Sequence, residues 1–154
     1  MATTNPAAGA RSRLQRAAQV VGAVFLLVGI LGFIPGITSN FGALGMAGHT
    51  SEALLLGVFQ VSVLHNIVHL LFGAAGLLLA RTPGQAKSYL LYGGIIYLVL
   101  WLYGLIINLN TPANFVPFNT ADNWLHFLLG VGMVALALLL SREGVRAPRT
   151  RTGH

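Results

Sequence analysis

The chain has 154 residues, of which 55% are hydrophobic and only 8% are charged, and its mean hydropathy is +0.75. A water-soluble domain needs charged and polar residues to cover its surface, so this composition indicates a protein that is solvated by a lipid bilayer. The absence of cysteine excludes disulfides and thiol chemistry, and the formal charge of +6 comes without any DNA- or RNA-recognition module, so no nucleic acid is expected as a partner.

Four apolar runs follow one another along the chain, and each is near or above the ~20 residues that a helix needs to cross ~30 Å of hydrocarbon. They cover about residues 17–34, 53–80, 89–107 and 121–140. Because the runs are continuous rather than alternating, they predict helices and not the strands of a membrane barrel. The sequence therefore predicts an all-α fold: an integral membrane four-helix bundle at residues 14–142 between two basic tails, residues 1–13 and 143–154.

The segments between the runs contain turn and capping signals. In the first outer loop, residues 35–52, Ser51 can cap the second helix. The dipeptide Pro83-Gly84 marks the turn between the second and third runs, which makes these two helices antiparallel neighbours. The second outer loop, residues 108–120, contains two prolines, four asparagines and two phenylalanines, and we expect it to form an ordered lid at the membrane interface.

The basic residues are distributed unevenly over the connections of this four-span arrangement. All nine fall before the first span, between the second and third, or after the fourth: Arg11, Arg13, Arg16, Arg81, Lys87, Arg142, Arg146, Arg149 and Arg151. This positive-inside pattern predicts a multi-pass protein of the inner (plasma) membrane with both termini in the cytoplasm. We expect the tails to contact anionic lipid head groups, each basic residue contributing on the order of 1 kcal/mol.

One octapeptide pattern occurs twice, as NIVHLLFG at residues 66–73 and as NWLHFLLG at residues 123–130. A second pair of matching segments precedes them, GAVFLLVGILG at residues 22–32 and GIIYLVLWLYG at residues 94–104. The repeat predicts that the bundle consists of two tandem helical hairpins of the same orientation, related by an axis along the membrane normal.

Ionisable residues within apolar spans are costly and need partners, so they indicate where a functional site lies. His65 and His69 are four residues apart and therefore share one face of the second helix. In the repeat, Asp122 and His126 hold the equivalent positions on the fourth helix. Counting along each helix from its membrane boundary places His69 and His126 at a similar depth, toward the outer side. The pattern therefore predicts one shared polar site.

Three imidazoles and one carboxylate suit Zn, Fe, Mn or Cu. The candidate metal ligands are His65, His69, Asp122 and His126. Alternatively, His69 and His126 hold a haem as its axial ligands, from two different helices. Asn66 and Asn123 would then fix the tautomers of these imidazoles. A third option is a proton relay through the His–Asp pairs, since histidine titrates near physiological pH.

The same polar residues can instead form a structural network, in which side chains hydrogen-bond across helices and each bond contributes ~1 kcal/mol. Asp122, two residues after an expected Thr120 cap, lies where the helix dipole favours a carboxylate without any ligand role. The sequence has no P-loop, nucleophile elbow, zinc-protease motif or dinucleotide fingerprint, so it does not indicate an enzyme.

Several segments resemble a known family, above all LHNIVHL at residues 64–70 and ADNWLH at residues 121–126. The resemblance extends over residues 14–142 and is to the bacterial family known as domain of unknown function 4383, small proteins with four expected spans. It implies an integral membrane protein, and it carries no activity with it.

From these patterns we expect a small integral membrane protein that is not an enzyme and serves as an accessory or structural component of the membrane. A haem- or metal-binding redox protein is one alternative, and a small transporter or proton-conducting protein is another. Glycines at helical spacing, such as Gly32 and Gly36, allow close helix packing. The same faces could pair with a second copy of the chain, as a homo-oligomer, or with another membrane protein.

Overall fold

The computed structural model describes residues 11–143, and these residues form four long helices. The helices are α1 (Arg13–Leu31), α2 (Val63–Leu79), α3 (Pro83–Ile106) and α4 (Thr120–Glu143). By length and composition, α1, α3 and α4 can each cross a membrane, whereas α2 has only 17 residues. The predictions of a mainly helical fold and of membrane-compatible helices are confirmed. The basic tails predicted at residues 1–13 and 143–154 lie almost wholly outside the described residues.

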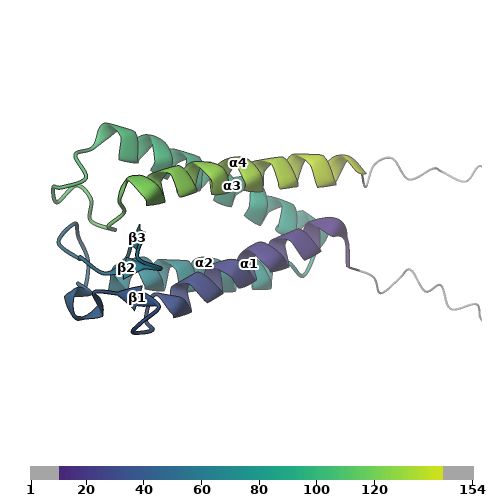
Figure 1. Ribbon diagram of the computed structural model, residues 1–154. Helices are drawn as coiled ribbons and strands as arrows, with labels where there is room; N and C mark the ends of the chain where they lie inside the picture. The colour runs from purple at the N-terminus through teal and green to yellow at the C-terminus, as the bar shows by residue number, and fades with distance from the viewer. Residues whose placement is uncertain (1–10, 144–154) are drawn as a thin grey trace, which may run out of the picture.

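The helices lie in two pairs, with α1 along α2 and α3 along α4 (Figure 1). Within the first pair the two backbones meet at glycines, because a Cβ added at Gly22 would lie 2.9 Å from the carbonyl oxygen of Gly73. The buried apolar core between the pairs consists of Leu14, Ala18, Phe25, Ala80, Ala86, Tyr89, Leu90, Tyr97, Met133 and Ala137. These residues come from α1, α3, α4 and the end of α2, and Phe72, Ala75 and Leu79 of α2 pack against them, so the core holds the two pairs together.

A single glutamine joins the start of α1 to the end of α2. The Ser12 hydroxyl accepts a hydrogen bond from the Gln15 backbone N–H at 3.2 Å, and the Gln15 side-chain oxygen accepts one from the Ser12 N–H at 2.9 Å. This reciprocal arrangement is a capping box, which satisfies two donors that the helix leaves unpaired. The Gln15 side-chain nitrogen donates to the carbonyl oxygens of Ala80 and Arg81, at 3.1 and 2.8 Å. The α2–α3 turn is thereby fixed against α1.

The second helix begins at Val63 rather than near residue 53, so the prediction of one helix over residues 53–80 is wrong for residues 53–62. The cap of α2 is Ser62 and not Ser51: the Ser62 hydroxyl accepts a hydrogen bond from the His65 backbone N–H at 3.0 Å. Ser51 instead donates to the Val61 carbonyl oxygen at 2.6 Å and braces the segment that leads into the helix.

The non-helical segment belongs to a small sheet that the all-α prediction does not include. Its strands are β1 (Thr38–Ser39), β2 (Leu54–Leu55) and β3 (Phe59–Gln60), paired antiparallel in that order, and a short 3₁₀ helix, η2 (Phe41–Ala43), follows β1. Leu56 and Gly57, between β2 and β3, have φ angles of 54° and 71°, the left-handed conformation that tight hairpins require. The sheet lies at the end of the bundle opposite the α2–α3 turn (Figure 1).

Candidate functional site

All four predicted ligand residues line one cavity between the helix pairs. His65 and His69 from α2 and Asp122 and His126 from α4 face a space of about 100 Å³. The three histidines also border a second cavity, of about 50 Å³, on the side of Tyr97. The imidazoles thus separate two small cavities, and the structure brings together the residues that the repeat relates.

Two of the imidazoles have a defined orientation. The rings of His65 and His69 are stacked, with centroids 4.5 Å apart and planes inclined by 27°. Nδ1 of His65 lies 3.0 Å from the Gln60 carbonyl oxygen, and Nδ1 of His69 lies 3.1 Å from the His65 carbonyl oxygen. A carbonyl oxygen only accepts, so Nδ1 is the protonated, donating nitrogen in both rings. In the neutral imidazole of His69, Nε2 therefore keeps the lone pair that could take a metal ion or a proton. The His65 ring also has the Pro117 carbonyl oxygen as a hydrogen-bond partner.

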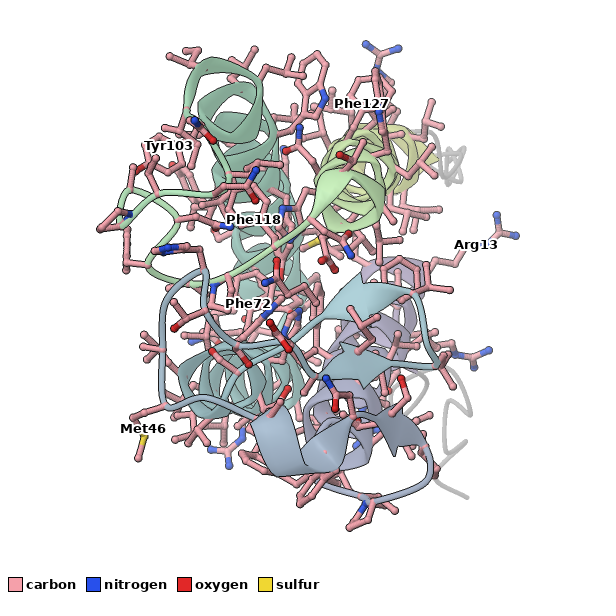
Figure 2. The ribbon with its side chains drawn as sticks, turned by 60° about the vertical axis from the view of Figure 1, so that its left-hand side comes forward. Arg13, Met46, Phe72, Tyr103, Phe118 and Phe127 are labelled. Atoms are coloured by element: carbon pink, nitrogen blue, oxygen red, sulfur yellow. The ribbon has the colours of Figure 1, made fainter. Side chains whose placement is uncertain are left out.

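His126 is enclosed by aromatic rings and has an unpaired nitrogen. Its ring lies edge-on to Tyr97 and Phe118, with centroids 5.2 and 5.3 Å away. Figure 2 shows Phe118 and Phe72 between the helix pairs, whereas Met46 points away from the molecule. Nδ1 of His126 is buried and has no hydrogen-bond partner among the described residues. Buried polar atoms are nearly always paired, so this nitrogen needs water or a small ligand as its partner.

The two asparagines of the repeat show the same incomplete pairing. Asn66 and Asn123 are 1% and 3% exposed, and Nδ2 of Asn66 and Oδ1 of Asn123 are buried without a partner in the described part of the chain. Each amide packs against a glycine, Asn66 on Gly32 and Asn123 on Gly104, where an added Cβ would collide with it. The polar side chains of the site therefore do not satisfy all of one another's hydrogen-bonding groups within the described residues.

Asp122 is held mainly by backbone donors. Its Oδ2 accepts hydrogen bonds from the N–H groups of Gln60, at 2.8 Å, and of Asn119, at 2.9 Å. The Asn119 side-chain oxygen accepts in turn from the Asp122 N–H at 3.0 Å, so Asn119, and not Thr120 as expected, caps α4. The Asn119 side-chain nitrogen donates to the Val58 carbonyl oxygen at 2.7 Å. This carboxylate therefore has a structural role whether or not it also meets a ligand.

The two outer loops cover the site together. Asn114 is 1% exposed, and its side-chain nitrogen donates to the carbonyl oxygens of Leu109 and Phe118, at 3.0 and 2.9 Å, which folds the loop of residues 107–119 around it. The Gly48 N–H donates to the Phe115 carbonyl oxygen at 2.8 Å, so the first outer loop is tied to the second. The predicted lid is in this way fastened to the sheet-bearing loop.

On the inner side, aromatic and apolar side chains close the site. Phe25 stacks on His69 at 5.6 Å and on Tyr97 at 5.3 Å, and Phe72 contacts both Phe25 and Tyr97 edge-on. Sequence reasoning missed these aromatic residues. The repeat contained the signal, because Phe25 and Tyr97 occupy the same place in the matching segments of α1 and α3. The imidazoles therefore lie nearer the end of the bundle with the sheet, and the aromatic residues lie between them and the α2–α3 turn.

The described residues contain no group of three or more His, Asp and Glu side chains already arranged around a point where a metal ion could sit. Binding of a metal at the three imidazoles would therefore require some of the rings to rotate. The cavities are also well below the roughly 300 Å³ at which sites for drug-sized ligands begin, so they suit an ion or a few water molecules better than a haem.

Comparison with known proteins gives one match. The family described as "Domain of unknown function (DUF4383)" matches residues 15–139, which is most of the chain. No curated protein and no solved structure matches the sequence.

Proposed function

Because the chain belongs to the DUF4383 family, whose description names no activity, we propose from its own residues that it is a small, non-enzymatic integral membrane protein that serves as an accessory or structural component of the plasma membrane. The supporting observation is the outer surface of the helices. Large apolar side chains are exposed on all four helices, for example Val24, Leu71, Ile96 and Leu128. About two-thirds of the Leu128 side chain is exposed. Soluble monomers rarely expose apolar patches of more than a few hundred Å², so this surface suits contact with acyl chains.

Four spans and cytoplasmic termini are the topology that we propose. The 17 residues of α2 extend about 25 Å at ~1.5 Å per residue, a little less than the ~30 Å of hydrocarbon. The buried segment before it, with Val61 and Ser62, can make up the difference. The described basic residues lie at one end of the bundle, at the start of α1, around the α2–α3 turn and at the end of α4, which supports that end as cytoplasmic.

Single-cysteine labelling tests this topology on a background that contains no cysteine. We expect an impermeant maleimide to label Met46→Cys and Phe115→Cys in intact spheroplasts, since these outer-loop residues are exposed. Arg81→Cys, in the inner turn, should react only after the membrane is permeabilised. If α2 does not span, positions 46 and 81 lie on the same side and will be labelled together. That result would contradict the four-span arrangement.

Equivalent glycine contacts support the proposal of two tandem hairpins. A Cβ added at Gly22 would lie 2.9 Å from the carbonyl oxygen of Gly73, and a Cβ added at Gly94 would lie 2.9 Å from the carbonyl oxygen of Gly130. The repeat relates Gly22 to Gly94 and Gly73 to Gly130. The close approach of α1 to α2 therefore recurs, at the related residues, between α3 and α4.

The same correspondence extends to the polar site. Asn66 packs on Gly32 in the first hairpin, and Asn123 packs on Gly104 in the second. Both asparagines and both glycines are repeat partners, which supports an axis between the hairpins near the imidazoles. A site on such an axis is assembled only when the two hairpins come together.

A transition-metal ion at the three imidazoles is the second candidate function. The observation that favours it is that His65, His69 and His126, from two helices, border both cavities, and that His126 has an unpaired buried nitrogen. The alternatives from the sequence are less well supported. The cavities are small for a haem. A proton or solute path would have to continue from the imidazoles to the inner end, and the aromatic layer that includes Phe25 and Tyr97 lies in between.

Elemental analysis and an absorption spectrum of the protein purified in mild detergent test this candidate. If the imidazoles hold a metal, the unmodified protein will contain a near-stoichiometric transition metal. His69→Ala and His126→Ala will then lose it, because each removes a donor nitrogen. His49→Ala is the matched control, since His49 lies in the first outer loop and lines neither cavity. A colourless and metal-free protein would contradict the second candidate and leave the histidines as a structural network within the proposed membrane component.

A further inference from the structure

A further cavity lies at the basic end of the bundle, away from the histidines. It is an open groove of about 680 Å³, within the ~300–1,000 Å³ of small-molecule sites. It is bordered by the starts of α1 and α3 and by the end of α4, and its lining residues are Ser12, Arg13, Leu14, Pro83, Gly84, Lys87, Leu140 and Ser141. Three segments distant in the sequence therefore meet around it.

The lining combines positive charge with apolar surface. Lys87 is half-buried at the cavity, whereas Arg13 is exposed at its rim, where Figure 2 shows its side chain extending outward. The helices α1 and α3 both begin at this cavity, so the positive ends of their dipoles add to the charge of these cations. Leu14, Pro83 and Leu140 supply apolar walls. An occupant with an anionic head and an apolar body would match both parts of the lining.

Charge at the two ends of the molecule is complementary to this assignment. Two of the three carboxylate residues of the chain, Glu52 and Asp122, belong to the end with the sheet and the start of α4, and the third, Glu143, is the last residue of α4 at the cavity end. The end of the molecule that holds the cavity contains arginines and a lysine. Because the basic residues outnumber Glu143 at the cavity end, an anion is attracted there.

We propose that this cavity binds the phosphate of an anionic phospholipid head group, such as that of phosphatidylglycerol, from the leaflet at the basic end. The phosphate lies between Arg13 and Lys87, and the glycerol and first acyl carbons lie against Leu14 and Leu140. The inference rests on the proposed membrane insertion, which places the cavity at the level where head groups lie. Basic pockets between helix ends on the cytoplasmic side are the usual form of such lipid sites.

Retention of lipid in the gas phase tests the proposal on the full-length protein. The protein is purified in detergent, mixed with equal amounts of phosphatidylglycerol and phosphatidylcholine, and examined by native mass spectrometry. We expect preferential retention of phosphatidylglycerol, and about a fivefold lower retention in Lys87→Gln, from the loss of one basic contact. Arg81→Gln is the matched control, because Arg81 is a cation at the same end that does not line the cavity, and it should retain lipid as the unmodified chain does.

Equal retention in Lys87→Gln and the unmodified protein would overturn the proposal, as would an equal loss in Arg81→Gln, which indicates surface charge alone. Inorganic phosphate is the second probe: at millimolar concentration it should neither displace the lipid nor raise the melting temperature. If it does both, the site belongs to a soluble phosphate compound and the lipid assignment is wrong. A separate control tests whether Lys87→Gln still inserts into the membrane. If only detergent extracts this variant from membranes, it is inserted, and its loss of lipid is not caused by failed insertion.

Discussion

A Gly73→Ala protein is expected to unfold at a clearly lower temperature than the unmodified protein, with a loss of about 2 kcal/mol or more. The added Cβ would lie 2.6 Å from the backbone nitrogen of Leu26 and 2.7 Å from the carbonyl oxygen of Gly22. Both contacts are to backbone of α1, which cannot rotate away as a side chain can, so α1 and α2 must separate. The measurement is the melting temperature in detergent, followed by intrinsic fluorescence or by loss of soluble protein.

Gly132→Ala is the control for this experiment, because no atom lies within 4 Å of a Cβ at Gly132. An added methyl there should leave stability unchanged or raise it by about 0.5–1 kcal/mol, through the better helix propensity of alanine. Gly130→Ala, two residues away on the same helix, should lower stability as Gly73→Ala does, since its Cβ would meet Leu98 and the carbonyl oxygen of Gly94. Equal behaviour of positions 73, 130 and 132 would contradict the close helix contacts and, with them, the equivalence of the hairpins.

Hydropathy and the repeat carried most of the information about this fold. The apolar runs located α1 and α4 to within about four residues, because a helix in a bilayer is apolar along its length. The helix α3 begins six residues before the predicted span, at Pro83, so Pro83-Gly84 starts the helix and is not part of the turn. The repeat related His69 to His126, and the structure places both at one pair of cavities. A pattern that recurs in two places indicates which residues share an environment, even though it does not identify what binds there.

The start of α2 could not be predicted in the same way. Residues 53–61 are as apolar as a helix, and a short apolar run does not distinguish a strand from a helix by periodicity. The hairpin depends on left-handed backbone at Leu56, an unfavourable conformation for leucine that pairing of β2 with β3 stabilises. Such tertiary compensation leaves no trace in the local sequence.

The dimensions of the site were equally inaccessible from the sequence. Whether three imidazoles enclose an ion, a haem or only water depends on how Phe25, Tyr97 and Phe118 fill the space around them, and these residues come from α1, α3 and the second loop. The role of Asp122 was uncertain for a similar reason. Its strongest partner outside α4 is the backbone N–H of Gln60, whose position follows from the unexpected sheet.

Replacing Asp122 by alanine should therefore have one of the largest effects of any single substitution in the outer half of the molecule. Two backbone donors, the N–H groups of Gln60 and Asn119, would lose their acceptor in a partly buried region. Each such donor costs about 1–3 kcal/mol, and the bond lost from the Asn119 N–H is also the reciprocal bond of the α4 cap. We expect a loss of roughly 2–5 kcal/mol and faster amide hydrogen exchange at Gln60 and Asn119, measured by exchange mass spectrometry.

Two controls separate the hydrogen bonds of Asp122 from its charge. Asp122→Asn keeps an acceptor oxygen and should lose less stability than Asp122→Ala. Glu52→Ala removes an exposed carboxylate from the same end of the molecule and should change the melting temperature little. If Asp122→Ala is no less stable than Asp122→Asn, the carboxylate does not join β3 to α4 as the distances indicate. If amide exchange in the sheet and the second loop becomes faster only in the alanine variant, the hydrogen bonds of Asp122 hold the outer loops over the imidazoles. This role of Asp122 is independent of any ligand that the imidazoles bind.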